Sequence, residues 1–287
     1  MTQAMSSEHS ATAPRAAAPP ALVARRVGLS FAGLRALDAL DFEIPAGGTS
    51  AVIGPNGAGK TTLFNCVSGL YRYEGELTLH GRPLGQLRPH QRARLGIART
   101  FQTPALLDGE SALQNVALGG VAHSRVGVLH SMLATPRRRQ EERETLERSF
   151  AVLDRFGIAA LAGRPVAGLA HGDRRRVEVA RALMSTPSLL MLDEPAAGLG
   201  AEEARDLLAE VEAHAGDDTT VLLVEHDVAL VMSVARRVVV LDSGRLLAVG
   251  TPDEVRTDPR VVEAYLGADD VDEPAPERLH AVSGETA

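Results

Sequence analysis

The fold is decided by the segment Gly54-Pro55-Asn56-Gly57-Ala58-Gly59-Lys60-Thr61, which follows an apolar stretch at 49–53 and opens a predicted helix. An apolar strand, a glycine-rich loop and a helix in this order are the context that a phosphate-binding P-loop requires. The glycines let successive backbone N–H groups point inward as an anion nest, and the start of the helix adds positive partial charge. Lys60 is therefore expected to reach the β- and γ-phosphates of a nucleotide and Thr61 to ligate Mg²⁺, with Thr62 completing the nucleotide-binding segment.

A pair of carboxylates, Asp193-Glu194, follows a second apolar strand at 189–192. A carboxylate at the end of a buried strand beside a P-loop is placed to hold Mg²⁺ through water, and the next carboxylate can polarise the attacking water. We expect the first role for Asp193 and the second for Glu194. Taken alone, the pattern is equally that of a strand ending in solvated charges, and the P-loop is what favours the catalytic interpretation.

The composition is that of a globular chain with a single lysine. Its 287 residues, 45% of them hydrophobic, suffice for one large α/β domain or two small ones. A net charge of −7 provides no global basic field for nucleic acid or an anionic membrane. Lys60 stands alone beside 29 arginines, which indicates a position that needs a compact ammonium group. The one cysteine, Cys66, cannot form an internal disulfide and fits a reduced, intracellular setting.

The two ends of the chain are expected to be disordered tails. Residues 1–20 are rich in Ala and Pro and lack an apolar block, so they do not resemble a secretory signal. Residues 268–287 form an acidic stretch with the same expectation. No segment reaches the roughly 18 consecutive apolar residues that a membrane-spanning helix needs. The ordered domain is therefore expected to cover residues 21–267.

The rest of the pattern predicts an α/β fold with a mainly parallel sheet, N-terminal antiparallel strands and an inserted helical subdomain. Short apolar runs bounded by turn residues predict strands. Strand signals vanish after about residue 103, so we expect the helical subdomain at about 103–186, with Leu146, Phe150 and Leu153 on one face of a charged helix at 137–156. Strands and helices then alternate, as in a parallel sheet covered on both faces. The predicted strands are 22–31, 40–44, 49–53, 76–79, 189–192, 220–224 and 238–241, and residues 242–245 turn a terminal hairpin.

One further segment, Leu169-Ala170-His171-Gly172-Asp173, leads into a predicted helix at about 173–185. By itself this segment reads as a solvated helix end, because the arginines that follow it oppose the helix dipole. Together with the P-loop and the carboxylate pair, however, the set resembles the ATP-binding-cassette (ABC) family, whose signature sequence occupies this position. The resemblance covers nearly all of 21–267 and implies a P-loop ATPase of ABC type.

The resemblance also assigns residues that carry little information alone. Gln102 matches the Q-loop glutamine, which senses Mg²⁺ and faces the membrane subunits, and His226 matches the switch histidine that contacts the γ-phosphate. Phe31 matches the aromatic residue that stacks on adenine, for which core packing is the alternative. Residues 197–200 lie where the family has its D-loop. The five residues of the signature segment are expected to bind nucleotide.

Helix length adds an expectation about assembly. A helix of 13 residues is roughly 20 Å long, so it separates Gly172 from the Asp193-Glu194 edge of the same chain. The signature should instead cap ATP bound to a second ATPase subunit through backbone N–H groups at the helix start. This matches the head-to-tail dimer of the family.

The signature segment departs from the common Leu-Ser-Gly-Gly-Gln of the family. Ala170 removes the hydroxyl, His171 replaces a glycine and Asp173 replaces the glutamine. A hydrogen bond to a charged group is worth roughly 1.5 to 3 kcal/mol, so one outcome is a weaker γ-phosphate contact and two unequal composite sites. The other outcome is compensation by backbone donors.

Within the family, the segments at 96–102, 196–199, 224–232 and 258–267 resemble the ATPases of branched-chain (hydrophobic) amino-acid importers. The resemblance implies two permease subunits, an external solute-binding protein and a second, related ATPase as dimer partner, at the cytoplasmic face of the bacterial inner membrane. Close relatives import urea or short amides. A soluble ABC ATPase acting on ribosomes or DNA is a further alternative, although such relatives usually carry two cassettes, coiled coils or basic insertions.

Overall fold

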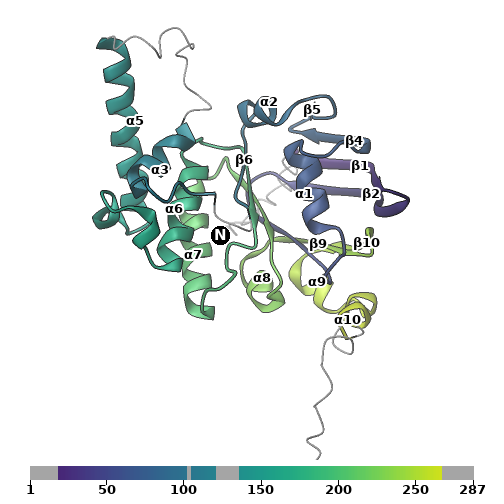
Figure 1. Ribbon diagram of the computed structural model, residues 1–287. Helices are drawn as coiled ribbons and strands as arrows, with labels where there is room; N and C mark the ends of the chain where they lie inside the picture. The colour runs from purple at the N-terminus through teal and green to yellow at the C-terminus, as the bar shows by residue number, and fades with distance from the viewer. Residues whose placement is uncertain (1–18, 102–104, 121–135, 267–287) are drawn as a thin grey trace, which may run out of the picture.

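The computed structural model describes residues 19–101, 105–120 and 136–266 (Figure 1). Most of the N-terminal tail, at 1–18, and the whole C-terminal tail, at 268–287, lie outside these ranges. The Q-loop residue Gln102 also lies outside them. No helix in the described part of the chain combines the length and the apolar character needed to cross a membrane.

The centre of the molecule is a six-stranded sheet with the order β10-β9-β3-β8-β7-β6. Neighbouring strands are parallel, except that β9 and β10 form the antiparallel hairpin predicted at 242–245. Apolar runs account for the strands, and β6 escaped prediction because it has only three residues. The strands are β3 (Gly48–Ile53), β6 (Ile97–Arg99), β7 (Leu189–Asp193), β8 (Thr220–Val224), β9 (Arg237–Asp242) and β10 (Arg245–Gly250).

A four-stranded antiparallel sheet packs beside it, in the order β2-β1-β4-β5. Its strands are β1 (Pro20–Phe31), β2 (Leu34–Pro45), β4 (Glu74–Leu79) and β5 (Arg82–Pro83). The prediction was wrong at two boundaries here, because β1 begins at Pro20, inside the expected tail, and β2 begins six residues before 40. The physical reason is irregular pairing: Arg26 and Ala39 have positive φ, and the register shifts break the apolar alternation.

Alternate residues of the central strands face two different cores. On β3, Ala51 and Ile53 join one core with residues of the helices on that face, whereas Val52 joins the other core, with α1 and the antiparallel sheet. Each buried aliphatic side chain contributes roughly 1.5 to 3 kcal/mol. The loops that follow the strands are therefore held between two packed layers.

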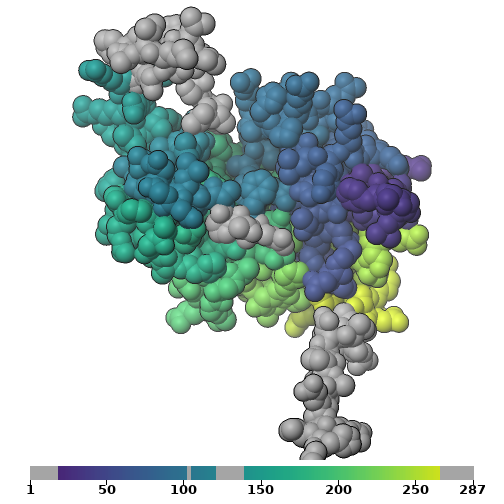
Figure 2. Space-filling model, viewed as in Figure 1, coloured from purple at the N-terminus to yellow at the C-terminus, as the bar shows by residue number. Residues whose placement is uncertain are grey.

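Some helices cover the central sheet. Others, among them α3 and α5, form a helical part at one end of the molecule, away from the antiparallel sheet (Figures 1 and 2). Between residues 105 and 186 the described segments contain helices and one isolated bridge between Ser111 and Pro165. The helices of this part are α3 (Ala112–Gly119), α5 (Pro136–Arg155), η2 (Ala159–Leu161), η3 (Val166–Gly168) and α6 (His171–Leu183). The others are α1 (Lys60–Ser68), α2 (Pro89–Arg94), α7 (Ala201–Ala215), α8 (Val228–Val234), α9 (Pro252–Arg256) and α10 (Pro259–Leu266).

Two expectations about helices need correction. Phe150 does not share the buried face of α5 with Leu153: it is 48% exposed, and Ser149 is buried in its place. A face that contains 149, 153 and 156 follows the 3.6-residue period as well as the predicted one does. In addition, α6 begins at His171 rather than at about 173, with Ala170 as its N-cap residue.

Candidate functional site

The P-loop joins β3 to α1 and lines a cavity of about 590 Å³. Gly54 is at φ 152°, where a Cβ would lie 2.0 Å from the carbonyl oxygen of Leu241, so no other residue fits. Gly59 has φ 100° and caps the start of α1. The residues that line the cavity are Leu34, Arg35, Ala36, Asn56, Gly57, Ala58, Gly59, Lys60, Thr61, Thr62, Glu194, His226, Ser243 and Gly244.

Lys60 is folded into its own loop. Its Nζ donates hydrogen bonds to the carbonyl oxygens of Gly54 at 2.5 Å and Pro55 at 3.0 Å. Burial lowers the pKa of the Lys60 ammonium, and the carboxylates of Glu194 and Asp193 oppose this shift. The cation is therefore held by two weak acceptors at the place where an anion nest would receive phosphate.

Asp193 ends β7 inside the protein, with 1% of its side chain exposed. One carboxylate oxygen, Oδ2, accepts a hydrogen bond from the guanidinium of Arg99 at 2.8 Å. The other, Oδ1, has no hydrogen-bond partner within the described residues although it is buried. A buried carboxylate oxygen without a donor is a suitable acceptor for a Mg²⁺-bound water, and the hydroxyl of Thr61 in the adjoining cavity is a second oxygen donor. These residues therefore fit the metal.

Glu194 and His226 meet at the edge of the cavity. Glu194 adopts φ 51°, a left-handed conformation that is rare outside glycine, and its N–H donates to the carbonyl oxygen of Val224 at 2.9 Å. The Nε2 of His226 lies 2.6 Å from Glu194 Oε1. Because β7 and β8 are adjacent and parallel, their C-terminal ends bring both side chains to the same edge. Residues with a left-handed backbone outside glycine cluster at functional sites, and here such a residue places its carboxylate beside an imidazole.

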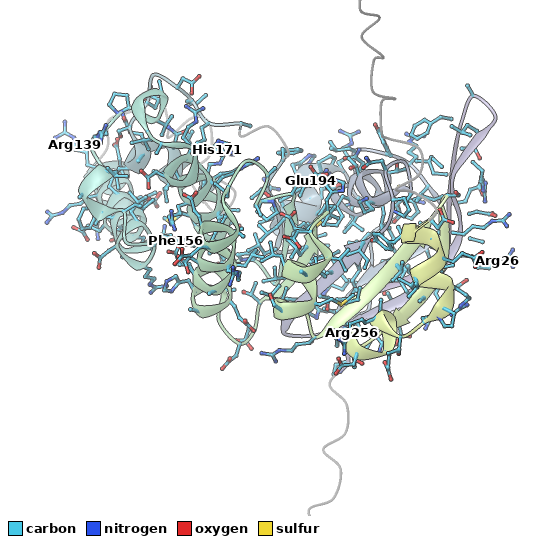
Figure 3. The ribbon with its side chains drawn as sticks, turned by 90° about the horizontal axis from the view of Figure 1, so that it is seen from below. Arg26, Arg139, Phe156, His171, Glu194 and Arg256 are labelled. Carbon is cyan, nitrogen blue, oxygen red and sulfur yellow. The ribbon has the colours of Figure 1, made fainter. Side chains whose placement is uncertain are left out.

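The signature segment lies outside this cavity. Ala170 caps α6 and Leu169 is buried, while Gly172 is packed so closely that a Cβ would meet Glu203 Oε1 at 1.7 Å. Asp173 stands in the first turn of α6, where a carboxylate interacts favourably with the helix dipole. His171 and Glu194 lie towards the same face of the molecule (Figure 3).

Of the two remaining predicted residues, only Phe31 lies in the described part of the chain, and it is not brought to the cavity. Phe31 lies at the end of the β1–β2 hairpin, is 43% exposed and packs edge-on against Tyr71, with ring centroids 5.2 Å apart. It is absent from the residues that line the P-loop cavity. Gln102 lies outside the described residues, between the segments 19–101 and 105–120.

Three buried charged residues were missed by sequence reasoning. Arg99 pairs with Asp193, Glu178 accepts the N–H of Phe101 at 3.2 Å, and Glu225 accepts the N–H of Ala196 at 2.8 Å. Burial raises the pKa of both glutamates. The available signal was position alone, because Arg99 precedes Gln102 and Glu225 precedes His226 in segments that were already singled out.

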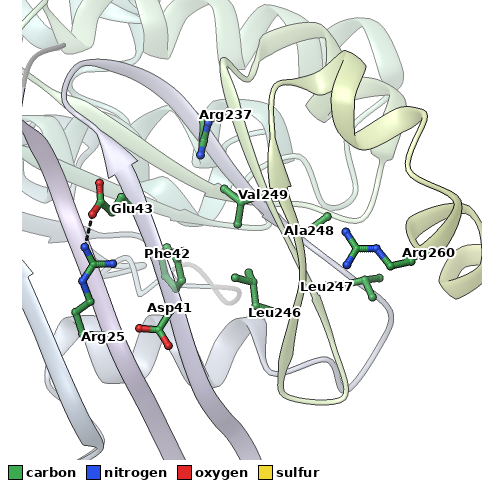
Figure 4. Close-up of a pocket in the computed structure, with 10 residues that line it drawn as sticks. All are labelled: Arg25, Asp41, Phe42, Glu43, Arg237, Leu246, Leu247, Ala248, Val249 and Arg260. Carbon is green, nitrogen blue, oxygen red and sulfur yellow. Dashed lines mark hydrogen bonds and ion pairs between the residues drawn. The ribbon is translucent and has the colours of Figure 1, made fainter. Parts of the chain in front are cut away.

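A second hollow of about 500 Å³ lies between β2 and β10 (Figure 4). Its arginines include Arg25, paired with Glu43, and Arg260, which forms an ion pair with Asp258 at 2.7 Å. In the described ranges no cluster of three or more His, Cys, Asp or Glu side chains is suited to holding a metal. Of these two hollows in the described part of the chain, the P-loop cavity combines a cation, a carboxylate and an imidazole.

Comparisons with known proteins agree with this geometry. Residues 37–197 match the family described as "ABC transporter", and residues 245–271 match the family described as "Branched-chain amino acid ATP-binding cassette transporter". The high-affinity branched-chain amino acid transport ATP-binding protein LivG of Salmonella typhimurium is 40% identical over 252 residues, which cover 86% of this chain and 98% of LivG. BraF of Pseudomonas aeruginosa, described in the same words, is 40% identical over 250 residues, 86% of this chain and 98% of BraF.

Solved structures lead to the same group. A nucleotide-free ATP-binding cassette from an ABC transporter superposes with a TM-score of 0.75 at 28% identity and covers 86% of this chain and 99% of that one. The ADP conformation of an ATP-binding cassette of an ABC transporter superposes with a TM-score of 0.75 at 28% identity. This match covers 87% of this chain and 99% of that one. The sequence match, the structural match and the P-loop cavity agree: this chain belongs to the ATP-binding proteins of the ABC transporter family and is an ATPase.

Proposed function

We propose that this chain is the ATP-hydrolysing subunit of an importer for branched-chain or other hydrophobic amino acids. Its relatives LivG and BraF are named as branched-chain amino acid transport ATP-binding proteins, and the match extends over nearly their whole length. The separate match of residues 245–271 to a branched-chain family supports this group over relatives that import urea or short amides.

Nucleotide binding is assigned to the P-loop cavity. Phosphate oxygens replace the carbonyl groups of Gly54 and Pro55 as acceptors for Lys60, and the backbone N–H groups of residues 56–62 surround them. The exposed ring of Phe31 is assigned to the adenine base, with which it stacks after leaving or sharing its contact with Tyr71.

Asp193, Thr61 and Gln102 are assigned to Mg²⁺. The buried and unpartnered Oδ1 of Asp193 supports this assignment, since it offers an acceptor that no donor within the described residues uses. Arg99 holds the other oxygen and so restricts rotation of the carboxylate. When bound, Mg²⁺ neutralises the negative charge that develops on the phosphate oxygens.

The contact between Glu194 and His226 carries the catalytic proposal. Glu194 orients and polarises the attacking water, and His226 contacts the γ-phosphate. The imidazole of His226 and the carboxylate of Glu194 share one hydrogen bond at 2.6 Å in the absence of nucleotide. Both side chains line the cavity together with Lys60, so the γ-phosphate would lie between this pair and the Lys60 ammonium group. The loss of a positioned general base typically slows a reaction by about 10²- to 10⁴-fold.

The start of α6 is assigned to a second ATPase subunit. Backbone N–H groups at residues 171–173 point out of the helix end and would cap the γ-phosphate of ATP bound by the partner. The assembly would further contain two permease subunits and, indirectly, a solute-binding protein, with the ATPases docked peripherally on the cytoplasmic face of the inner membrane. No nucleic acid is expected as a partner.

The deciding experiment is the substitution Glu194→Gln in the transporter reconstituted with its membrane partners. We expect nucleotide affinity within about twofold of the original and ATP turnover reduced by at least about 100-fold, because the amide cannot accept a proton. The closed state should accumulate and retain unhydrolysed ATP when free nucleotide is removed from the transporter. Undiminished steady-state hydrolysis would refute the role of Glu194. Glu212→Gln, on the exposed surface of α7, serves as the matched control.

A further inference from the structure

The loop at 196–200, between β7 and α7, is held by side chains from two distant parts of the chain. Within the loop and its flank, Ala197 N–H donates to Glu194 O at 3.2 Å and Leu199 N–H donates to Ala196 O at 3.0 Å. The side chains that reach it come from Glu225, after β8, and from His171, at the start of α6. The loop therefore touches both the catalytic edge and the signature segment.

Glu225 holds the first part of this loop. Its side chain is buried, Oε1 accepts the N–H of Ala196 at 2.8 Å, and Oε2 accepts the N–H of His226 at 3.3 Å. One carboxylate thus bridges the backbone two residues after Glu194 to the backbone of His226. Burying a carboxylate close to Glu194 is unfavourable, and the two N–H donors offset part of this cost.

His171 holds the second part. Its Nε2 donates to the carbonyl oxygen of Ala197 at 2.9 Å. The ring also lies against Gly198, where a Cβ would approach Nε2 to 2.9 Å and where φ is 80°. Glycine at 198 is therefore required both by the backbone conformation and by the space that the ring occupies.

We propose that Glu225 is a positioning residue for ATP hydrolysis, which fixes the 196–200 loop to His226 so that Glu194 stays in its left-handed conformation. His171 anchors the opposite side of the same loop to α6. This inference rests on the roles proposed above for Glu194 and His226. The left-handed conformation of Glu194 is strained, and a strained conformation persists only when its surroundings over-determine it. Besides the hydrogen bonds of Glu194 to Val224 and Ala197, the hydrogen bond from Ala196 to Glu225 fixes the backbone two residues further along.

The test compares Glu225→Ala and Glu225→Gln in the full-length protein assembled with its transporter partners. We expect kcat of Glu225→Ala to fall about 10- to 100-fold while KM for ATP stays within about threefold, because a small misplacement of Glu194 affects the chemical step and not the P-loop. Amide hydrogen exchange at Ala196 should accelerate at least about tenfold. Glu225→Gln keeps one acceptor oxygen, so its kcat and its exchange rate at Ala196 should be close to those of the original protein.

Glu254→Gln is the matched control. The Glu254 carboxylate also accepts a backbone N–H, from Thr251 at 2.8 Å, but it lies on α9 and does not line the cavity. Its kcat and the exchange rate at Ala196 should match those of the original protein. A double variant, His171→Ala with Glu225→Ala, tests whether both anchors hold one loop. If they do, kcat of the double variant should fall by less than the product of the two single decreases.

Two results would overturn the proposal. One is a Glu225→Ala protein with kcat within about twofold of the original and unchanged exchange at Ala196. The other is a rise in KM that accounts for the whole loss, which would indicate damage to nucleotide binding. If Glu194→Gln hydrolyses ATP normally, the proposed function fails by itself, whereas the exchange rate at Ala196 still reports whether Glu225 holds the loop.

Discussion

The P-loop cavity and the start of α6, both proposed to bind nucleotide, are built in different ways. The cavity gathers the side chains of Lys60, Glu194 and His226 at the ends of parallel strands, with Asp193 buried beside them. The start of α6 offers a cap without a side-chain hydrogen bond, at Ala170, and a glycine packed against Glu203. Contacts made by side chains depend on residue identity, whereas contacts made by backbone N–H groups, as proposed for α6, would tolerate substitutions. Contacts through the backbone would tolerate the departures at 170 and 173, whereas the side chain at 171 also contacts the 196–200 loop.

The largest expected effect separates the two regions most clearly. Lys60→Met should weaken ATP binding to the isolated subunit by about 100-fold or more, because charge-assisted hydrogen bonds to two phosphates are lost. Isothermal calorimetry measures the affinity. Arg245→Met, which removes an exposed cation paired with Asp38, is the control and should leave the affinity unchanged. Equal losses in both variants would mean that general positive charge, and not the cavity, binds the nucleotide.

A smaller effect is expected at the start of α6. Gly172→Ala places a methyl group against the Glu203 carboxylate and the N–H groups of the helix end, so ATP turnover of the assembled transporter should fall about tenfold. ATP affinity of the isolated subunit should remain within about twofold, since residue 172 does not line the cavity. Gly168→Ala is matched to it, because a Cβ there meets open space. A loss of ATP affinity in the isolated Gly172→Ala subunit would show that the P-loop cavity and the start of α6 do not act separately.

The smallest effect concerns the missing hydroxyl. Ala170→Ser gives α6 an N-cap side chain, which should raise the free energy of unfolding by about 1 kcal/mol, measured by urea denaturation. Turnover of the assembled transporter should change by no more than about threefold if the backbone supplies the γ-phosphate contact. An increase of tenfold or more would show instead that the absent hydroxyl limits the reaction and that the two composite sites are unequal.

The fold could be predicted from the sequence wherever an apolar run was regular. The strand at 220–224 agrees to the residue, because all five of its residues are buried and turn residues precede it. The first half of β2 was missed since positive φ at Ala39 shifts the pairing, and such a shift leaves no apolar alternation to detect. Phe150 was placed wrongly because two helix faces fit the period equally well.

The site divides in the same way. The P-loop and the pair Asp193-Glu194 were found because motif and strand context occur together in the sequence. Glu225 and Arg99 were missed because each makes a buried contact with a residue distant in sequence, Ala196 and Asp193 respectively, and such contacts have no period or spacing. The roles of all the site residues remain predictions. The ring of Phe31 lies at the hairpin end and does not line the cavity, and Gln102 lies between the described segments.

The single lysine has a spectroscopic consequence. A protein produced with isotope-labelled lysine carries the label at one ammonium group in 287 residues, and that group sits between the carbonyl oxygens of Gly54 and Pro55. Its side chain gives one magnetic resonance signal that needs no assignment. The position of that signal during a titration reports when phosphate takes the place of the two carbonyls, so the chain already contains a probe at its own nucleotide site.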